Sequence, residues 1–296
     1  MKKKLIFFLL FCSSIMSFSF AETVNIATWN IRINIKNDSI AGNIWGNRSR
    51  AIVDIVLFYD FDFMGVQEDY EKELNELNEK LPDYKRVGFP NHENGFLGSF
   101  NTIFYKKGRF AIVDSGMFYL SPEEDKPTLG WNAKYIRSCS WARFKEIGKK
   151  KYYLVFNTHT DYAGGESERE STKLLIKKIN LLSKKSDIVL LMGDLNFNQR
   201  GEGYRILNNS EVIKDAYDLT LLKMANNGTF NKFDPNHVSN DRVDHIFVSP
   251  QVSVRKYGIL TESYWYENSQ RLPSDHYPVF IQIDNDVKKS YKSKRK

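Results

Sequence analysis

The sequence predicts an α/β (α+β) fold: a four-layer sandwich in which two mixed β-sheets pack face to face and helices flank them. The first observation is that the predicted strands outnumber the predicted helices and are mixed with them along the chain. The second is the capacity for a large core, because 42% of the 296 residues are hydrophobic, including 21 Phe and 16 Tyr. No repeat, low-complexity linker or break in composition divides the chain. We therefore expect one domain from residue 22 to residue 284.

The first 21 residues have the pattern of a secretory signal peptide. A basic start at Lys2–Lys4 leads into an apolar centre at Leu5–Phe11, and Ser19–Ala21 offers a small-residue cleavage site. Because the apolar centre is too short to span a bilayer, we expect cleavage after Ala21 and export from a bacterial cell, either to the periplasm or beyond it; an uncleaved anchor is the alternative. The mature chain would keep Cys139 as its single cysteine, so no internal disulfide could form.

The formal net charge of +7 lies mainly at the two ends of the chain. Three lysines belong to the leader, and the tail at residues 285–296 carries six Lys or Arg against one Asp, so the body between them is close to neutral. We expect the tail to be a solvated, disordered end. The alternative is a tether for a polyanion such as nucleic acid or anionic lipid.

Periodicity places the elements of the first half of the chain. Apolar residues at helical spacing predict helices at Asn47–Tyr59 and Asp69–Leu81. Short apolar or alternating runs predict strands at Val24–Thr28, Phe61–Val66, Tyr84–Phe89, Phe100–Tyr105, Arg109–Asp114, Gly116–Leu120, Ser138–Lys145 and Lys151–Asn157. We expect Gly108 and Gly148 to mark hairpin turns between strands of this segment.

In the second half, a helix is predicted at Glu166–Leu182 and strands at Arg242–Val248, Val252–Gly258 and Val279–Ile283. Between them lies the stretch DIVLLMGDLNFN, whose apolar run Ile188–Met192 is typical of a strand buried on both faces. Asp194 and Asn196 follow at alternate positions, so an extended backbone would project both into one space. Gly193 would let a ligand approach the backbone. The alternative is an ordinary Asp-Leu-Asn turn.

Polar side chains recur in this way wherever a predicted strand ends or begins. Singly, each could be a turn residue, a helix-terminal charge or a hydrogen-bonded core histidine. Their shared placement favours one site at one edge of the fold. The set is Asn30, Glu68, His159, Asp194, Asn196, Asp244, Asp275 and His276.

The segments around these residues carry a specific resemblance. TWNIR, GVQE, NTHTD, GDLN, RVDHIFVS and SDHYPV, in that order, resemble the endonuclease/exonuclease/phosphatase superfamily of deoxyribonuclease-like phosphodiesterases, in a secreted bacterial branch. The resemblance runs from Asn25 to about Ile283. It implies a metal-dependent phosphoric ester hydrolase. One departure is Ser99, near which an acidic residue would be expected, so a substrate contact there is in doubt.

The resemblance also implies roles for the residues. Asp194 would activate the attacking water and Asn196 would orient it, while His159 would stabilise the phosphoryl charge. His276 would contact the phosphoryl oxygens, with Asp244 holding its other ring nitrogen and favouring its charged form. Arg137 is either a phosphate clamp or a surface arginine. His92, His237 and His245 are given no role, and His245 should point away from Asp244.

Oxygen ligands suit a hard divalent cation. Asn30, Glu68 and Asp275 supply amide and carboxylate oxygens, so we expect Mg²⁺, with Mn²⁺ or Ca²⁺ as alternatives. The sequence has no cluster of cysteines and no His-x₃-His pair, which argues against zinc.

The substrate is less well defined by the sequence. We expect a phosphodiesterase or nuclease. The alternatives are a lipid hydrolase, similar to a sphingomyelinase or a phospholipase C, and a phosphomonoesterase.

A nuclease would need a basic groove, which the near-neutral body does not indicate. A lipid hydrolase would use exposed aromatic residues, for which Tyr264–Tyr266 and Trp131 are candidates, although these could equally pack in the core or stack on a base or sugar. A catalytically dead binding module would show damaged motifs, and none is damaged. The substrate partner would thus be a nucleic acid, a phospholipid or a sugar phosphodiester, bound by a monomer with no obligate protein partner.

Overall fold

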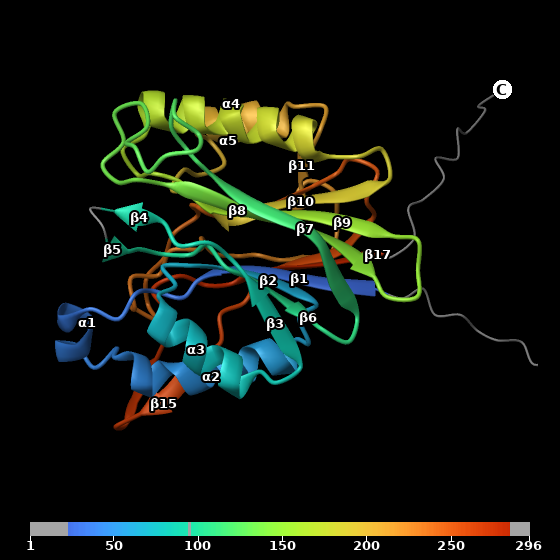
Figure 1. The fold of residues 1–296 in the computed structure, drawn as a ribbon. Coiled ribbons are helices and arrows are strands. Elements are labelled where there is room, and N and C mark those ends of the chain that lie inside the picture. The colour runs from blue at the N-terminus through green and yellow to red at the C-terminus, as the bar shows by residue number, and fades with distance from the viewer. Residues whose placement is uncertain (1–22, 94–95, 285–296) are drawn as a thin grey trace, which may run out of the picture.

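The structure is a computed structural model, and it describes residues 23–93 and 96–284. The predicted signal peptide at residues 1–21 and the basic tail at residues 285–296 lie outside the described residues. Figure 1 shows two central sheets stacked face to face, with helices above and below them. This arrangement confirms the predicted four-layer sandwich.

One sheet has seven strands, and β1 (Thr23–Asn30) lies at its centre. It is parallel to β2 (Phe63–Gln67) and antiparallel to β17 (Val279–Asp284). The remaining strands extend the sheet on both sides. In order across the sheet they are β12 (Lys223–Met224) and β14 (Val254–Ile259) before β17, and β6 (Ile103–Lys106) and β3 (Tyr84–Val87) after β2.

The other sheet has six strands, centred on β10 (Asp187–Asp194) and β9 (Tyr152–His159), which run parallel. Across this sheet the order is β11 (Lys214–Asp215), β13 (Asp244–Val248), β10, β9, β8 (Ser138–Glu146) and β7 (Phe110–Tyr119). Two small hairpins stand apart, formed by β4 (His92–Glu93) with β5 (Phe96–Leu97) and by β15 (Tyr264–Tyr266) with β16 (Ser269–Arg271).

Apolar side chains of both sheets meet in the central core. The rings of Phe144 and Tyr153 from the six-stranded sheet lie 5.0 and 5.6 Å from the ring of Phe63 in the seven-stranded sheet. Burying a side chain of this size contributes roughly 1.5–3 kcal/mol relative to exposure. The inner layers are therefore held together mainly by hydrophobic contact.

Helices bury the outer faces. Helices α2 (Trp45–Phe58) and α3 (Glu71–Lys80) pack on the seven-stranded sheet, and α4 (Gly165–Leu182) and α5 (Glu202–Asn208) pack on the six-stranded sheet (Figure 1). Strand β10 thus lies between the central core and α4, which explains why all eight of its residues are buried. A fifth helix, α1 (Lys36–Ile40), is short and has no buried residue.

Three features of the middle and end of the chain differ from expectation. Gly108 does not mark a hairpin, because β6 and β7 belong to different sheets and the turn carries the chain across the core. The two strands predicted at 109–114 and 116–120 are one strand, β7, with a register shift between Ile112 and Asp114. Helices α1 and α5 and the β15–β16 hairpin had no periodic signal, since each is too short to show one.

Within the described residues, no helix is both long and apolar enough to cross a membrane. Cys139 is fully buried in β8, where burial raises the pKa of its thiol. It is therefore an inert core residue.

Candidate active site

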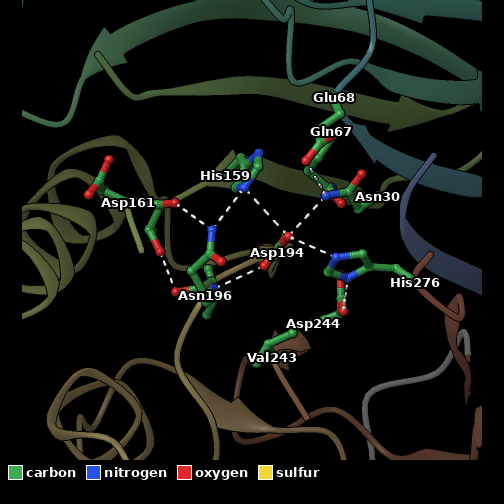
Figure 2. Close-up of polar contacts among 12 residues, drawn as sticks. Asn30, Gln67, Glu68, His159, Asp161, Asp194, Asn196, Val243, Asp244 and His276 are labelled. Carbon is green, nitrogen blue, oxygen red and sulfur yellow. Dashed lines mark hydrogen bonds and ion pairs between the residues drawn. The ribbon is translucent and has the colours of Figure 1, made fainter. Parts of the chain in front are cut away.

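Strand direction brings the predicted site residues to one edge of the molecule. The parallel strands β1 and β2 end at Asn30 and just before Glu68, and the parallel strands β9 and β10 end at His159 and Asp194. Strand β13, antiparallel to β10, begins with Asp244 directly opposite Asp194. Asp275 and His276 lie just before β17, which is antiparallel to β1. Figure 2 shows most of these side chains converging on one space.

Asp194 lies at the centre of this group (Figure 2). Its Oδ2 atom accepts a hydrogen bond from Asn30 Nδ2 at 3.0 Å, and it lies 3.5 Å from His159 Nε2 and 3.7 Å from His276 Nε2. Burial, and then the negative charge of Asp244, raise the pKa of Asp194 to about 7. A carboxylate that can take up a proton near neutral pH suits a general base.

His276 is held on its other side by Asp244. Its Nδ1 atom lies 2.9 Å from Asp244 Oδ2, and both side chains are buried. Burial alone would lower the pKa of His276, but the charges of Asp244 and Asp194 outweigh it and raise that pKa to about 10. At neutral pH the ring is therefore an imidazolium, with Nε2–H directed toward Asp194.

The turn after β10 presents Asn196 to the site in a way that an extended strand would not. Its backbone is left-handed, with φ of +51°, and its N–H donates to Asp194 Oδ1 at 3.0 Å. Its Nδ2 donates to the Thr160 carbonyl at 2.9 Å and lies 2.9 Å from His159 Nε2. The Asp-Leu-Asn segment thus forms a turn, and that turn places Asp194 and Asn196 in the site. Asparagine tolerates the left-handed region better than most residues.

Gly193 serves strand packing and not ligand approach, contrary to the expectation from sequence. A Cβ at this position would lie 1.9 Å from the carbonyl oxygen of Thr158 on β9. The glycine therefore lets β9 and β10 lie close together where both enter the site.

His159 differs electrostatically from His276. Burial, followed by the charges of Arg137 and His276, lowers the pKa of His159 well below its usual value, so the ring is neutral. Because Asn196 Nδ2 is a donor, Nε2 of this ring accepts and Nδ1 carries the proton. Nδ1 is buried and has no hydrogen-bond partner among the described residues.

Three oxygen ligands lie beside this network. Glu68, with a left-handed φ of +54°, accepts hydrogen bonds from Asn30 Nδ2 at 3.1 Å and from the Ile33 N–H at 3.1 Å. Burial, together with the Glu68 charge, raises the pKa of Asp275. Arg32 Nη1 lies 3.7 Å from Glu68 and 3.6 Å from Asp275, beyond hydrogen-bonding distance. Asn30 Oδ1 accepts the Arg32 N–H at 3.0 Å and keeps one lone pair. The two carboxylates, with one distant cation, leave further oxygen atoms for a hard divalent ion, so these residues would fit Mg²⁺.

A second group could also hold an ion by distance alone. Ligand atoms of Asp194, Asp244 and His276 all lie within 4.8 Å of one another. His276 Nδ1, however, is already bonded to Asp244 Oδ2 at 2.9 Å, so an ion held by both residues would have to replace that bond. We therefore interpret Asp244 and His276 as a hydrogen-bonded pair beside Asp194, and Asn30, Glu68 and Asp275 as the residues that would hold the ion.

The site opens into a cavity of about 500 Å³. Arg137 lies on its wall, with Nε 3.7 Å from the buried carboxylate of Asp161. Ser99 also faces the cavity, but its hydroxyl donates to Asp69 at 2.6 Å. The residues on the wall that the sequence did not single out are Arg32, Ile33, Tyr70, Asn91, Gly98, Tyr135, Ile136, Tyr162 and Phe230. Tyr135 and Tyr162 lie two and three residues from Arg137 and His159, but nearness in the sequence does not place a side chain on the cavity wall.

His245 lies on the opposite face of β13, as its position after Asp244 predicted. It is fully buried, its Nε2 lies 3.2 Å from the Phe197 carbonyl, and its ring packs against Tyr204 of α5. It takes no part in the site.

Two mixed sheets packed face to face carry a carboxylate, an imidazolium and further oxygen-bearing side chains at one edge. This fold and this site are typical of phosphoric ester hydrolases. Residues 27–276 match the Endonuclease/Exonuclease/phosphatase family. The chain belongs to that family, and it is an enzyme that hydrolyses phosphoric esters.

Solved structures of other proteins support the same family assignment. An endonuclease/exonuclease/phosphatase family protein of Bacteroides thetaiotaomicron is 36% identical, with a TM-score of 0.85 over 88% of this chain and 95% of the other. The mannosyl-6-phosphatase Bt3783 of the same organism is 37% identical, with a TM-score of 0.84 over 88% of this chain and 99% of that one. The TDP2 protein of D. rerio, complexed with a single-strand DNA product, is 18% identical, with a TM-score of 0.64 over 88% of this chain and 98% of its own, and shares the fold. No curated protein matches the chain.

Proposed function

We propose that this protein is an exported, divalent-metal-dependent phosphomonoesterase that acts on a sugar phosphate. The observation that carries the proposal is the size of the site: a half-open cavity of about 500 Å³, the size of a small-molecule pocket. The 37% identity to a mannosyl-6-phosphatase, which the chain covers almost completely, supports the same class of substrate.

A nuclease remains the principal alternative, and the charge around the cavity disfavours it. A backbone-tracking groove needs several free Lys or Arg side chains. Among the described residues, the cationic side chains on the cavity wall are Arg32, Arg137 and the His276 imidazolium. Each already lies within 4 Å of a carboxylate: Arg32 near Asp38, Arg137 near Asp161 and His276 near Asp244. Such a wall suits one phosphate group better than a polymer of them.

The residues of the site can divide the hydrolysis between them. A bound Mg²⁺ would neutralise charge on the phosphoryl group. Asp194, with a pKa near neutrality, takes a proton from the attacking water. His276 donates Nε2–H to a phosphoryl oxygen as charge develops there, and Asp244 keeps its ring charged and oriented. Asn196, fixed by its turn, orients the water. As the new P–O bond forms, the P–O bond to the sugar breaks, and the leaving oxygen takes up a proton from the surrounding water.

The test is phosphate release by the purified mature protein with Mg²⁺. The panel contains mannose 6-phosphate, glycerol 3-phosphate, an aryl phosphodiester, sphingomyelin and plasmid DNA. The proposal expects sugar monoester turnover to exceed every diester, and expects Asp194→Asn to remove it. Faster cleavage of DNA or of the aryl diester would replace the proposal with the nuclease or phosphodiesterase alternative.

A further inference from the structure

Two tyrosines stand exposed at the wall of the catalytic cavity. Tyr135 and Tyr162 keep 45% and 56% of their surface accessible, and their ring centroids lie 5.8 Å apart with the planes inclined at 54°. Neither ring lies in the network around Asp194. Large aromatic side chains held open beside a polar site offer apolar faces to a ligand.

The loops that carry these tyrosines are tied together by one buried carboxylate. Asp161 accepts the backbone N–H groups of Lys134 and Tyr135 at 3.0 and 2.9 Å, and that of Ala163 at 2.8 Å. Figure 2 shows its carboxylate directed away from Asp194, so it takes no part in the chemistry. It fixes the segment before β8 against the segment after β9, and with them both rings.

Asp161 also joins this pair of tyrosines to the phosphate end of the cavity. The Arg137 guanidinium lies 3.7 Å from Asp161 and 5.4 Å from the Tyr135 ring centroid, a cation–π contact. His159 precedes Asp161 by two residues on the same strand end. A substrate whose phosphate reaches Asp194 would therefore lay its other end beside Tyr135 and Tyr162.

A polar acceptor lines the same wall. Asn91 is 9% exposed, and its Nδ2 donates to the Ile136 carbonyl. Its Oδ1 has no hydrogen-bond partner among the residues that the structure describes. Because this oxygen is itself buried, it presents no surface to a ligand, and the role of Asn91 is to hold the wall through its bond to Ile136.

We propose that Tyr135 and Tyr162 form a subsite for the leaving group, and that this group is a hexopyranose. Two adjoining ring faces inclined at 54° present an angled apolar surface, which suits a puckered ring with an apolar C–H face better than a flat base, because a base stacks on one parallel plane. This inference rests on the proposed function, since it names the alcohol of the same phosphate ester.

The experiment compares a ring ester with a small one. The kcat/KM values for mannose 6-phosphate and glycerol 3-phosphate are measured for Tyr135→Ala, Tyr162→Ala and the double variant. Trp265→Ala, which removes an aromatic side chain with 77% exposure away from the cavity, is the matched control.

We expect the preference for mannose 6-phosphate to fall about tenfold in the double variant, within the range found for a lost stacking contact. The rate on glycerol 3-phosphate and both rates of Trp265→Ala should stay within about twofold of wild type. The Tyr→Phe variants should keep the preference, because the ring faces remain.

The outcomes separate this subsite from the proposed function. Equal losses on both esters would mean that the tyrosines act through Arg137 or the fold, and would overturn the subsite. An unchanged preference, or Phe variants as weak as Ala variants, would overturn it too. A wild-type preference for adenosine 5′-phosphate that the Ala variants lose would assign the subsite to a base instead.

A binding measurement covers the case in which mannose 6-phosphate is not hydrolysed. Calorimetry in the Asp194→Asn background compares binding of the two esters with and without the tyrosines. If mannose 6-phosphate binds more tightly through the tyrosines but wild type does not turn it over, the subsite stands and the proposed function fails. If it is hydrolysed without help from the tyrosines, the proposed function stands and the subsite fails.

Discussion

His276 bridges two buried carboxylates, with Nδ1 2.9 Å from Asp244 and Nε2 3.7 Å from Asp194. The two contacts are not equivalent. The shorter is a charge-assisted hydrogen bond that fixes the ring, whereas the longer is beyond hydrogen-bonding distance, so both groups stay free to contact an oxygen atom placed beside them. The geometry thus distinguishes a carboxylate that orients the imidazolium from one that shares a reaction space with it.

This difference predicts non-additive effects of substitution. Asp244→Asn and His276→Ala should each lower kcat, and the double variant should be little worse than His276→Ala, because Asp244 acts through the ring. Steady-state kinetics of the four proteins measure the coupling. Effects that multiply independently would show that Asp244 has a separate role.

The pH dependence of the rate of Asp244→Asn tests the pairing of Asp244 with His276 in a second way. The pKa of His276 is raised to about 10, so the wild-type rate should hold until that region and fall above it as the ring loses its proton. Removing the Asp244 charge should bring the alkaline limb toward the ordinary histidine value. An alkaline limb that does not move would contradict the electrostatic role of Asp244.

Asp194→Asn should lower kcat by roughly 10²–10⁴ while the protein stays folded, because the amide keeps the shape but cannot accept the proton of water. Circular dichroism checks the fold, and kcat for the best ester in the panel checks the chemistry. Asp125→Asn, the same change at an exposed residue outside the cavity, is a control that should leave kcat unaltered. A near-wild-type Asp194→Asn enzyme would remove this residue from the reaction.

The fold was predictable because its long elements obey simple periodicities. The run Ile188–Met192 could be placed as a strand buried on both faces because a core and a helix layer cover it, as α4 and the central core do. Gly108 was misassigned because a turn between two sheets and a hairpin turn use the same residues. Only long-range packing distinguishes them.

The candidate site was predictable where a residue follows a strand end, and not where it lies on a loop. Asn30, Glu68 and His159 were found from the strand directions, which place them at one edge. Tyr135 and Asn91 reach the cavity because Asp161 and Ile136 hold their loops by contacts more than 25 residues apart in sequence. No local pattern carries that information. The left-handed turn at Asn196 was likewise hidden, because Asp-Leu-Asn is also compatible with an extended chain.

A buried ion pair behind the site predicts a stability effect. Asp215 lies 2.9 Å from Arg242 Nη1, and both side chains are almost fully buried. Burial alone would raise the pKa of Asp215, but neighbouring His245 and Arg242 override it and lower that pKa to about 2. Asp215→Asn leaves the Arg242 charge without its partner, so the free energy of unfolding at pH 7 should fall by roughly 3–5 kcal/mol. Urea denaturation measures this change.

The sign of the pH dependence follows from the lowered pKa. The contribution of Asp215 is fully present above its unfolded-state pKa of about 3.9, and it is lost as the pH falls through about 2. The difference between wild type and Asp215→Asn should therefore be constant from pH 7 to about 4 and shrink below that. Asp54→Asn, which breaks the exposed Arg50–Asp54 pair, is the control and should change stability by no more than about 0.5 kcal/mol. A wild-type advantage that persists unchanged toward pH 2 would show that Asp215 is not ionised in the fold.

Metal dependence gives the last prediction. Activity should be lost in EDTA and return with Mg²⁺ or Mn²⁺, since Asn30, Glu68 and Asp275 present hard oxygen ligands beside a single guanidinium at 3.6–3.7 Å. Glu68→Gln replaces an anionic oxygen by a neutral one, so the Mg²⁺ concentration for half-maximal activity should rise by roughly tenfold or more.

The matched control is Glu79→Gln on the exposed face of α3, which removes a similar charge outside the cavity. Because an ion that binds the folded state stabilises it, Mg²⁺ should also raise the Tm of wild type more than that of Glu68→Gln. Full activity in excess EDTA would end the metal hypothesis, whereas an unchanged Mg²⁺ requirement in Glu68→Gln would move the ion to the group formed by Asp194, Asp244 and His276.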